Sequence, residues 1–214
     1  MNKKNRLKII FEDKNIIVVE KEAGLLTIGT EKERERTLYH EVLNYLKKKN
    51  QKVFIVHRLD KDTSGLIVFA KSLKAKTILQ DNWDKVIRKY YAIVYGNTKD
   101  NDTIKIKLSE NKAFKSFIDD KFGKLAITHY KKIKEKGKYT LLDIDIITGR
   151  KNQIRVSMDY INAPIIGDKK YGDAPNPLRR LCLHAYYLEF INPITKEKLV
   201  LETSIPKSFN NLID

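Results

Sequence analysis

The sequence predicts an α+β protein with a mainly antiparallel, mixed central β-sheet that is flanked by a few helices. Strand-sized apolar runs outnumber helical segments along the 214 residues, and the two do not alternate regularly. A parallel sheet built from strand–helix–strand units is therefore not indicated. Because no repeat, low-complexity segment or Gly/Ser-rich linker divides the chain, we expect a single domain over residues 1–214.

The first elements are a hairpin, a loop and a helix. RLKIIF and NIIVVE flank the polar turn EDKN over residues 6–20, which indicates a β-hairpin, and residues 21–30 continue as a Gly-marked loop. Residues 38–49 are predicted to form a helix with Thr37 as its N-cap. Its apolar stripe consists of Leu38, Val42, Leu43 and Leu46.

Two short buried strands are expected next, at residues 52–56 and 66–70. A second helix over residues 72–83 has Ser72 in the capping position. Residues 88–96 then form a strand that stops at a glycine.

The second half of the chain contains several strand-sized runs, of which residues 103–108 and 139–147 are the clearest. Residues 152–161 fit helix or strand by periodicity, and we favour a helix because TGRK precedes them and NAP ends them. Residues 164–180 are a loop rich in Gly and Pro. The last two expected strands are residues 181–190 and 198–203.

The charge balance points to a polyanionic partner. The chain has 43 Lys and Arg against 27 Asp and Glu, a formal net charge of +16. Such an excess speeds the capture of polyanions, and nucleic acid is the favoured one. A membrane surface is less favoured, because no basic amphipathic segment stands apart from the rest.

Three observations indicate a reducing cytoplasm. A single cysteine, Cys182, excludes an internal disulfide framework and a cysteine-rich metal site, and its apolar neighbours predict a core position. The N-terminus has no apolar run long enough for a signal peptide. No apolar stretch approaches the length that spans a bilayer.

Residues 56–71, VHRLDKDTSGLIVFAK, place two aspartates between apolar runs. Asp60 and Asp62 have the spacing of the first ligands in a twelve-residue calcium loop. The last ligand of that loop is a bidentate glutamate, but the residue here is Lys71, which disfavours calcium.

The aspartates could instead shape a turn, because Asp, Ser and Gly favour turns through local hydrogen bonds. Asp60, however, directly follows a predicted buried strand, where rigid scaffolds hold catalytic groups.

His57 and His184 are expected to be structural. A catalytic carboxylate needs a nearby cation to stay ionised, and three candidates are open. They are Arg58, Arg150 and Arg155.

Four ordered motifs and a C-terminal strand resemble those of the RluA-type pseudouridine synthases. HRLDKDTSGL fills every fixed position of the family's HRLD-x-x-TSGL signature, and RKYYAIVYG resembles its K-x-Y-x-A-x-V-x-G strand. The resemblance extends over about residues 8–206 and implies the pseudouridine synthase fold with an active-site cleft across the sheet. The other similar segments are residues 11–26, 148–172 and 181–193.

The resemblance implies isomerisation of uridine in RNA to pseudouridine without cofactor or metal. The uracil must leave C1′, turn and rejoin the sugar through C5. Asp60 matches the catalytic aspartate, whereas Asp62 falls at a variable position and is expected to be a turn residue. Arg155 matches the partner of that aspartate, so an ion pair with Asp60 is expected. Tyr90 matches the tyrosine that can stack on the uracil and assist proton movement at C5, and Tyr91 should face the opposite way.

A uridine inside structured RNA must be flipped out to reach such a site. The family assigns this step to the arginine of HRLD, which is Arg58 here. Arg150, Lys151 and Gln153 are further expected RNA contacts. The substrate would be a stem-loop of tRNA or rRNA, and the protein a monomer. The alternative is a non-catalytic RNA-binding or RNA-folding protein on the same scaffold.

The chain also departs from the family motifs, although not at a catalytic position. These departures leave local hydrogen bonds and substrate choice open. The first hairpin starts near residue 7, so the family's common N-terminal S4-type RNA-binding domain is expected to be absent. Histidine is replaced by Asn152, Ser157, Ala163 and Asn192, proline by Glu22, and lysine by Arg88.

Overall fold

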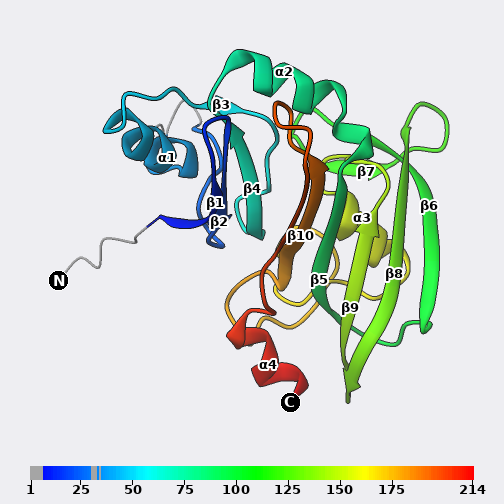
Figure 1. The fold of residues 1–214 in the computed structure, drawn as a ribbon. Helices are drawn as coiled ribbons and strands as arrows, with labels where there is room; N and C mark the ends of the chain where they lie inside the picture. The colour runs from blue at the N-terminus through cyan, green and yellow to red at the C-terminus, as the bar shows by residue number, and fades with distance from the viewer. Residues whose placement is uncertain (1–6, 30–32, 34) are drawn as a thin grey trace. The chain divides into compact units, whose positions relative to one another are not determined.

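The computed structural model describes residues 7–29, 33 and 35–214, and the chain divides into two compact units (Figure 1). The prediction of a single domain stays a prediction. The first unit consists of Met1–Val86 and Leu188–Thr203, and the second of Ile87–Tyr187 and Ser204–Asp214.

The first unit is built on antiparallel strands. β1 (Lys8–Glu12) and β2 (Ile16–Lys21) form the predicted hairpin, and β2 pairs with β4 (Ser64–Ala70) so that Lys21 lies opposite Gly65. β3 also pairs with β4, and β11 pairs with β10. The other elements are α1 (Leu38–Lys47), β3 (Phe54–Ile55), α2 (Leu73–Asp81), a 3-10 turn (Trp83–Lys85), the end of β10 (Leu183–Ile191) and β11 (Lys198–Glu202).

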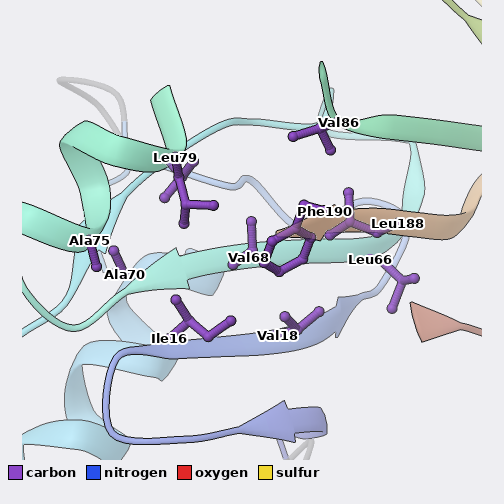
Figure 2. Close-up of a cluster of buried hydrophobic side chains, with 11 residues drawn as sticks. Ile16, Val18, Leu66, Val68, Ala70, Ala75, Leu79, Val86, Leu188 and Phe190 are labelled. Atoms are coloured by element: carbon purple, nitrogen blue, oxygen red, sulfur yellow. The ribbon is translucent and has the colours of Figure 1, made fainter. Parts of the chain in front are cut away.

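A hydrophobic cluster forms the core of this unit, with side chains from β2, β4, α2 and the end of β10 (Figure 2). Every residue of β4 is buried, as predicted for residues 66–70. Full burial of a side chain such as valine, leucine or phenylalanine contributes about 1.5–3 kcal/mol. The buried members are Ile16, Val18, Val56, Leu66, Val68, Ala70, Ala75, Leu79, Val86, Leu188 and Phe190.

Both predicted helix caps are confirmed. The Thr37 hydroxyl accepts a hydrogen bond from the backbone N–H of His40, and the Ser72 hydroxyl accepts one from the backbone N–H of Ala75, each at 3.1 Å. These bonds satisfy backbone donors that a helix N-terminus otherwise leaves open. Leu43 of the predicted stripe is only half-buried, and the buried residues are Leu38, Val42 and Leu46.

The second unit contains a larger sheet, in which β5–β9, β9–β8, β8–β6 and β6–β7 are antiparallel pairs (Figure 1). Its strand order is β10-β5-β9-β8-β6-β7, and the predicted fold class, α+β with a mainly antiparallel sheet, is confirmed. α3 packs against β6, β7 and β8, and α4 packs against β8 and β9. The elements are β5 (Ile87–Tyr95), β6 (Asn101–Glu110), β7 (Ser116–Ile118), β8 (Lys124–Lys136), β9 (Tyr139–Ile146), α3 (Gln153–Tyr160), the start of β10, and α4 (Lys207–Ile213).

The structure differs from the sequence prediction at two elements. α4 was not expected, because its segment is short and rich in polar residues; two buried side chains four residues apart, Phe209 and Ile213, hold it to the sheet. The strand expected at residues 52–56 contains only Phe54 and Ile55. The helix favoured over residues 152–161 is confirmed as α3. No helix in the described part of the chain is long and apolar enough to cross a membrane.

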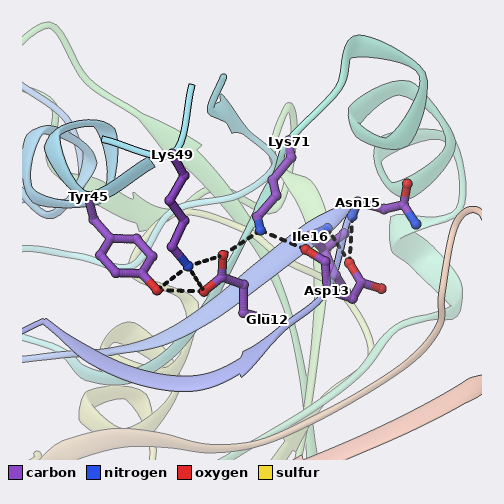
Figure 3. A network of polar contacts seen from close by, with 7 residues as sticks. All are labelled: Glu12, Asp13, Asn15, Ile16, Tyr45, Lys49 and Lys71. Carbon is purple, nitrogen blue, oxygen red and sulfur yellow. Dashed lines mark hydrogen bonds and ion pairs between the residues drawn. The ribbon is translucent and has the colours of Figure 1, made fainter. Parts of the chain in front are cut away.

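Lys71, the residue that disfavours calcium, belongs to a polar network of the first unit (Figure 3). Its ammonium group donates to Glu12 Oε1 and to the carbonyl of Asp13, each at 2.6 Å. Glu12 also accepts hydrogen bonds from the Tyr45 hydroxyl at 2.7 Å and from Lys49 at 3.0 Å. Burial acts to raise the pKa of Glu12, but the hydrogen bonds from Lys71, Tyr45 and Lys49 outweigh it and lower that pKa to about 2.

This network predicts an acid-sensitive part of the stability. Because folding lowers the pKa of Glu12 from 4.5 to about 2, the stabilisation is complete above pH 4.5 and is lost as the pH falls toward 2. Glu12→Gln should lower the free energy of unfolding at neutral pH by about 1–2 kcal/mol, a value reduced for solvent screening. Urea titrations between pH 7 and pH 2 should show a flatter pH profile for the variant. The control is Asp102→Asn in the exposed Lys99–Asp102 pair, which should change the unfolding free energy little. A pH profile of Glu12→Gln that equals that of wild type would contradict the stabilising role of Glu12.

Candidate active site

Asp60 opens a tight turn in the first unit. The backbone N–H of Thr63 donates to the Asp60 carbonyl at 3.2 Å, and β4 begins at Ser64. Asp60 is half-buried, whereas Asp62, within the turn, is exposed. Asp62 thus occupies the position of a turn residue, as expected, and the Asp60 carboxylate lies where a buried strand is about to begin.

Two buried side chains hold the backbone on either side of Asp60. The fully buried Lys21 ammonium donates to the carbonyls of Glu22, Leu25 and Lys61 at 2.9, 2.6 and 2.8 Å. The Thr27 hydroxyl donates to the Leu59 carbonyl at 2.8 Å and accepts from the Leu59 N–H at 3.3 Å. The backbone of residues 59 and 61 is therefore held by hydrogen bonds from buried side chains. Lys21 and Thr27 thus fix the position of the backbone on either side of Asp60.

His57 and Arg58 precede this turn. The Nε2 atom of His57 accepts a hydrogen bond from the backbone N–H of Val68 at 3.1 Å, and its ring centroid lies 4.3 Å from that of Trp83. These contacts agree with a structural role for His57. Arg58 is exposed, as an RNA contact would require.

Tyr90 lies on β5 of the second unit, paired with Ile144 of β9. It is buried, and Tyr91 turns to the opposite face, where its ring stacks on Tyr186 at a centroid distance of 3.7 Å. Arg88, two residues before Tyr90, is also buried, and this burial lowers the pKa of its guanidinium.

Arg155 lies on α3 and forms a bidentate ion pair with Asp168. Its Nε donates to Asp168 Oδ2 and its terminal NH₂ group to Oδ1, both at 2.7 Å. The two side chains are 9% and 1% exposed, so the pair is nearly removed from solvent. A planar guanidinium held at two nitrogens has little freedom to rotate. Asp168 therefore sets the orientation of Arg155.

Asp168 also organises its own loop. Its Oδ1 atom accepts hydrogen bonds from the backbone N–H groups of Lys170 at 2.8 Å and Tyr171 at 3.0 Å. The Tyr171 ring centroid lies 5.1 Å from the Arg155 guanidinium, within cation–π distance. Gly172, with a φ of +70°, keeps this loop compact, since a Cβ there would lie 2.3 Å from the Pro164 side chain.

The expected RNA contacts in the second unit divide into two kinds. Arg150 and Lys151 are exposed, although Arg150 donates to the Leu125 carbonyl at 2.9 Å and Lys151 to Glu110 at 2.8 Å. Gln153 is buried. Its amide hydrogen bonds are all made within the protein, so it has none left to offer RNA, and we assign it to positioning the turn before α3. Its partners are Ile127, Thr128, Thr148 and the N–H of Arg150.

Three of the departures from the family motifs have local hydrogen-bond partners. Asn152 has a left-handed backbone with a φ of 54°, which suits asparagine, and it accepts a hydrogen bond from the Tyr171 hydroxyl at 3.1 Å. The hydroxyls of Ser157 and Thr128 lie 3.1 Å apart. Asn192 donates to Asp13 at 2.7 Å. The side chains of Asn152, Ser157 and Asn192 therefore have hydrogen-bond partners within the protein, whereas Ala163 has no polar side-chain group.

The predicted site residues are divided between the two units. Asp60 and Arg58 belong to the first, and Tyr90 and Arg155 to the second. The ion pair between Asp60 and Arg155 stays a prediction. Within residues 7–29, 33 and 35–214 there is no group of three or more His, Cys, Asp or Glu side chains placed to hold a metal. Cys182 is buried, as expected, and this burial raises its pKa to about 12.

The sequence is similar to known enzymes over nearly its whole length. Residues 15–160 match the family model of RNA pseudouridylate synthases. The ribosomal large subunit pseudouridine synthase D of Buchnera aphidicola subsp. Baizongia pistaciae is 36% identical, with 97% of this chain and 71% of that protein covered. The ribosomal large subunit pseudouridine synthase C of Rickettsia bellii is 35% identical, with 95% and 70% covered.

The fold is also similar to solved structures. The structure titled Human RNA Pseudouridylate Synthase Domain Containing 4 superposes with a TM-score of 0.80 at 26% identity, and covers 95% of this chain and 90% of that one. The structure of Human RNA Pseudouridylate Synthase Domain Containing 1 has the same TM-score at 22% identity, which supports the fold alone.

Proposed function

We propose that this chain, which belongs to the RNA pseudouridylate synthase family, acts on the ribosomal RNA of the large subunit. The chain is an RNA pseudouridine synthase, an isomerase that converts uridine to pseudouridine. The choice of RNA rests on one observation. Relatives named for the ribosomal large subunit are 36% and 35% identical across 97% and 95% of this chain.

We assign the chemical step to Asp60. Moving uracil from N1 to C5 breaks and remakes a bond at C1′, so a carboxylate is needed at the junction of sugar and base, as nucleophile or as proton acceptor. The tied backbone on both sides of Asp60 supports this role, because a catalytic group must be held in a fixed geometry.

Tyr90 and Arg155 are proposed to complete the site. The Tyr90 ring would stack on the uracil, and its hydroxyl would assist the loss of the proton from C5. Arg155 would keep Asp60 ionised, and the bidentate contact with Asp168 supports this role because it presents the guanidinium in one orientation.

RNA binding is proposed to involve the exposed Arg58, Arg150 and Lys151. Extrusion of the target uridine costs a few kcal/mol of stacking, and Arg58 would assist that step. The net charge of +16 supports a backbone affinity that falls steeply with salt. A monomeric state, a cytoplasmic location and catalysis without cofactor or metal complete the proposal.

Mapping pseudouridine in total RNA from cells with and without the gene tests this function. We expect one or more pseudouridines of large-subunit ribosomal RNA to be missing from the deleted strain and restored by the wild-type gene. Loss of sites only in transfer RNA would contradict the ribosomal assignment but not the reaction. An identical map in both strains would contradict the proposed cellular function.

A further inference from the structure

The loop between β6 and β7, residues 111–115, exposes an aromatic side chain in an unusual backbone conformation. Phe114 is 68% exposed and has a φ of +56°, in the left-handed region. Bulky residues rarely adopt this conformation, which is common only for glycine. Such strain persists only where the surrounding structure enforces it. Strained backbone and an exposed aromatic ring together point to a binding role rather than to packing.

The hydrogen bonds of the loop enforce this conformation. The Asn111 side-chain carbonyl accepts from the N–H groups of Ala113 at 3.0 Å and Lys115 at 2.9 Å. The N–H of Phe114 donates to the Asn111 carbonyl at 2.9 Å, and the N–H of Asn111 donates to the Lys115 carbonyl at 3.0 Å. Phe114 is therefore presented by a rigid turn.

The same loop is joined to the cluster around Arg155. The backbone N–H of Ser116 donates to the Tyr171 hydroxyl at 2.9 Å, and the Ser116 hydroxyl donates to the Lys151 carbonyl at 2.8 Å. Lys170 donates to the carbonyl of Phe114 at 2.9 Å. Because Tyr171 also contacts Arg155, the backbone that carries Phe114 is linked to the surroundings of that arginine.

The surroundings of Phe114 contain three lysines, one of which, Lys151, also pairs with Glu110. The Lys151 ammonium lies 4.8 Å from the centroid of the Phe114 ring. The ammonium groups of Lys115 and Lys170 lie 5.5 and 5.6 Å from the centroid of Tyr171. Lysines next to an exposed aromatic face are typical of proteins that bind unpaired nucleic acid, since bases stack on the ring and phosphates pair with the cations.

We propose that Phe114 is a stacking site for an unpaired RNA base, with Lys115, Lys151 and Lys170 contacting the adjacent phosphates. The site extends the RNA-binding surface beyond the residues that act on the target uridine. The inference rests on the proposed action on RNA, and it adds Phe114, which none of the sequence motifs contains.

Phe114→Asn is the central test, because asparagine tolerates the left-handed backbone while the ring is lost. The probe is a fluorescent RNA hairpin with a uridine-containing loop, and the readout is its Kd. We expect the Kd to rise about tenfold, within the range measured for the loss of one base–aromatic stack. The matched control is Phe122→Asn, since Phe122 is 77% exposed with Lys121 5.2 Å from its ring and should leave the Kd unchanged.

Two further measurements separate the contribution of base stacking to RNA affinity from that of charge. Phe114→Asn should leave the slope of log Kd against log salt unchanged, whereas Lys151→Ala should reduce it by about one. Phe114→Trp should bind about as tightly as wild type, and its added fluorescence should be quenched by the hairpin loop. A fully paired duplex offers no free base to stack and should not quench it.

The inference is overturned if Phe114→Asn binds the hairpin as tightly as wild type, or if Phe122→Asn weakens binding equally. Quenching of Phe114→Trp by the duplex to the same extent would also overturn it. Binding is measured without reference to isomerisation. Absence of pseudouridine formation by wild type would therefore count against the proposed function alone, and an unchanged Kd against this inference alone.

Discussion

Asp60→Asn is expected to slow pseudouridine formation at least about a thousandfold, because the amide keeps the shape of the side chain but can act neither as nucleophile nor as base. The substrate is ribosomal RNA isolated from gene-deleted cells, and pseudouridine is counted over time. Affinity for that RNA should change far less than the rate, since backbone contacts provide most of the binding.

Asp62→Asn is the matched control for this prediction. Asp62 is exposed in the same turn, two residues from Asp60, so the substitution should leave the rate within about threefold of wild type. Thermal unfolding verifies that both variants are folded. Equal rates for Asp60→Asn and wild type would contradict the catalytic assignment, and an equal loss in both variants would indicate that the turn, rather than one carboxylate, matters.

Asp168→Ala is expected to have the largest effect on stability. It leaves the buried guanidinium of Arg155 without its bidentate partner, and breaking a buried pair in this way costs about 3–5 kcal/mol. It also removes the acceptor for the N–H groups of Lys170 and Tyr171. Denaturant unfolding should show the lower stability, and pseudouridine formation should fall even at temperatures where the variant is folded.

The double variant Arg155→Met, Asp168→Leu separates the loss of stability from the loss of pseudouridine formation. Replacing a buried ion pair by apolar side chains often restores stability, so this protein should be more stable than Asp168→Ala but remain inactive. Glu135→Gln is the control for ion pairs in general, because the exposed Lys132–Glu135 pair should contribute at most about 1 kcal/mol. A cost below that value for Asp168→Ala would contradict the role of Asp168.

The sequence predicted Asp60 because its motif is contiguous and because a buried strand was expected directly before it. That strand ends at Ile55 in the structure, and Asp60 lies instead in the turn that leads into β4.

The sequence could not predict Asp168 as the partner of Arg155. Asp168 lies 13 residues further along, in a loop whose path depends on tertiary contacts, and the motif GDKKYG was the only signal. The buried ammonium of Lys21 was missed for a similar reason. Its three carbonyl partners include Lys61, which is 40 residues away.

Predictions from periodicity were most reliable for regular elements with apolar faces. β4, β5 and α3 follow the expected segments, and Thr37 and Ser72 cap helices as their residue types indicate. Burial of individual polar side chains was less predictable. Gln153 was an expected RNA contact, but its side chain is buried and its amide donates to Thr128 and to the carbonyl of Ile127. The strain at Phe114 depends on the hydrogen bonds of its loop and has no sequence signature.

The most direct test of the central claim is release of the C5 hydrogen. Ribosomal RNA from gene-deleted cells is labelled with tritium at C5 of uridine and incubated with purified wild-type protein. Because C5 must bond to C1′, each pseudouridine formed should release its tritium to water, while Asp60→Asn should release none above background. RNA binding by the wild-type protein without tritium release, on this RNA and on transfer RNA, would contradict the account and would favour a non-catalytic RNA-binding protein.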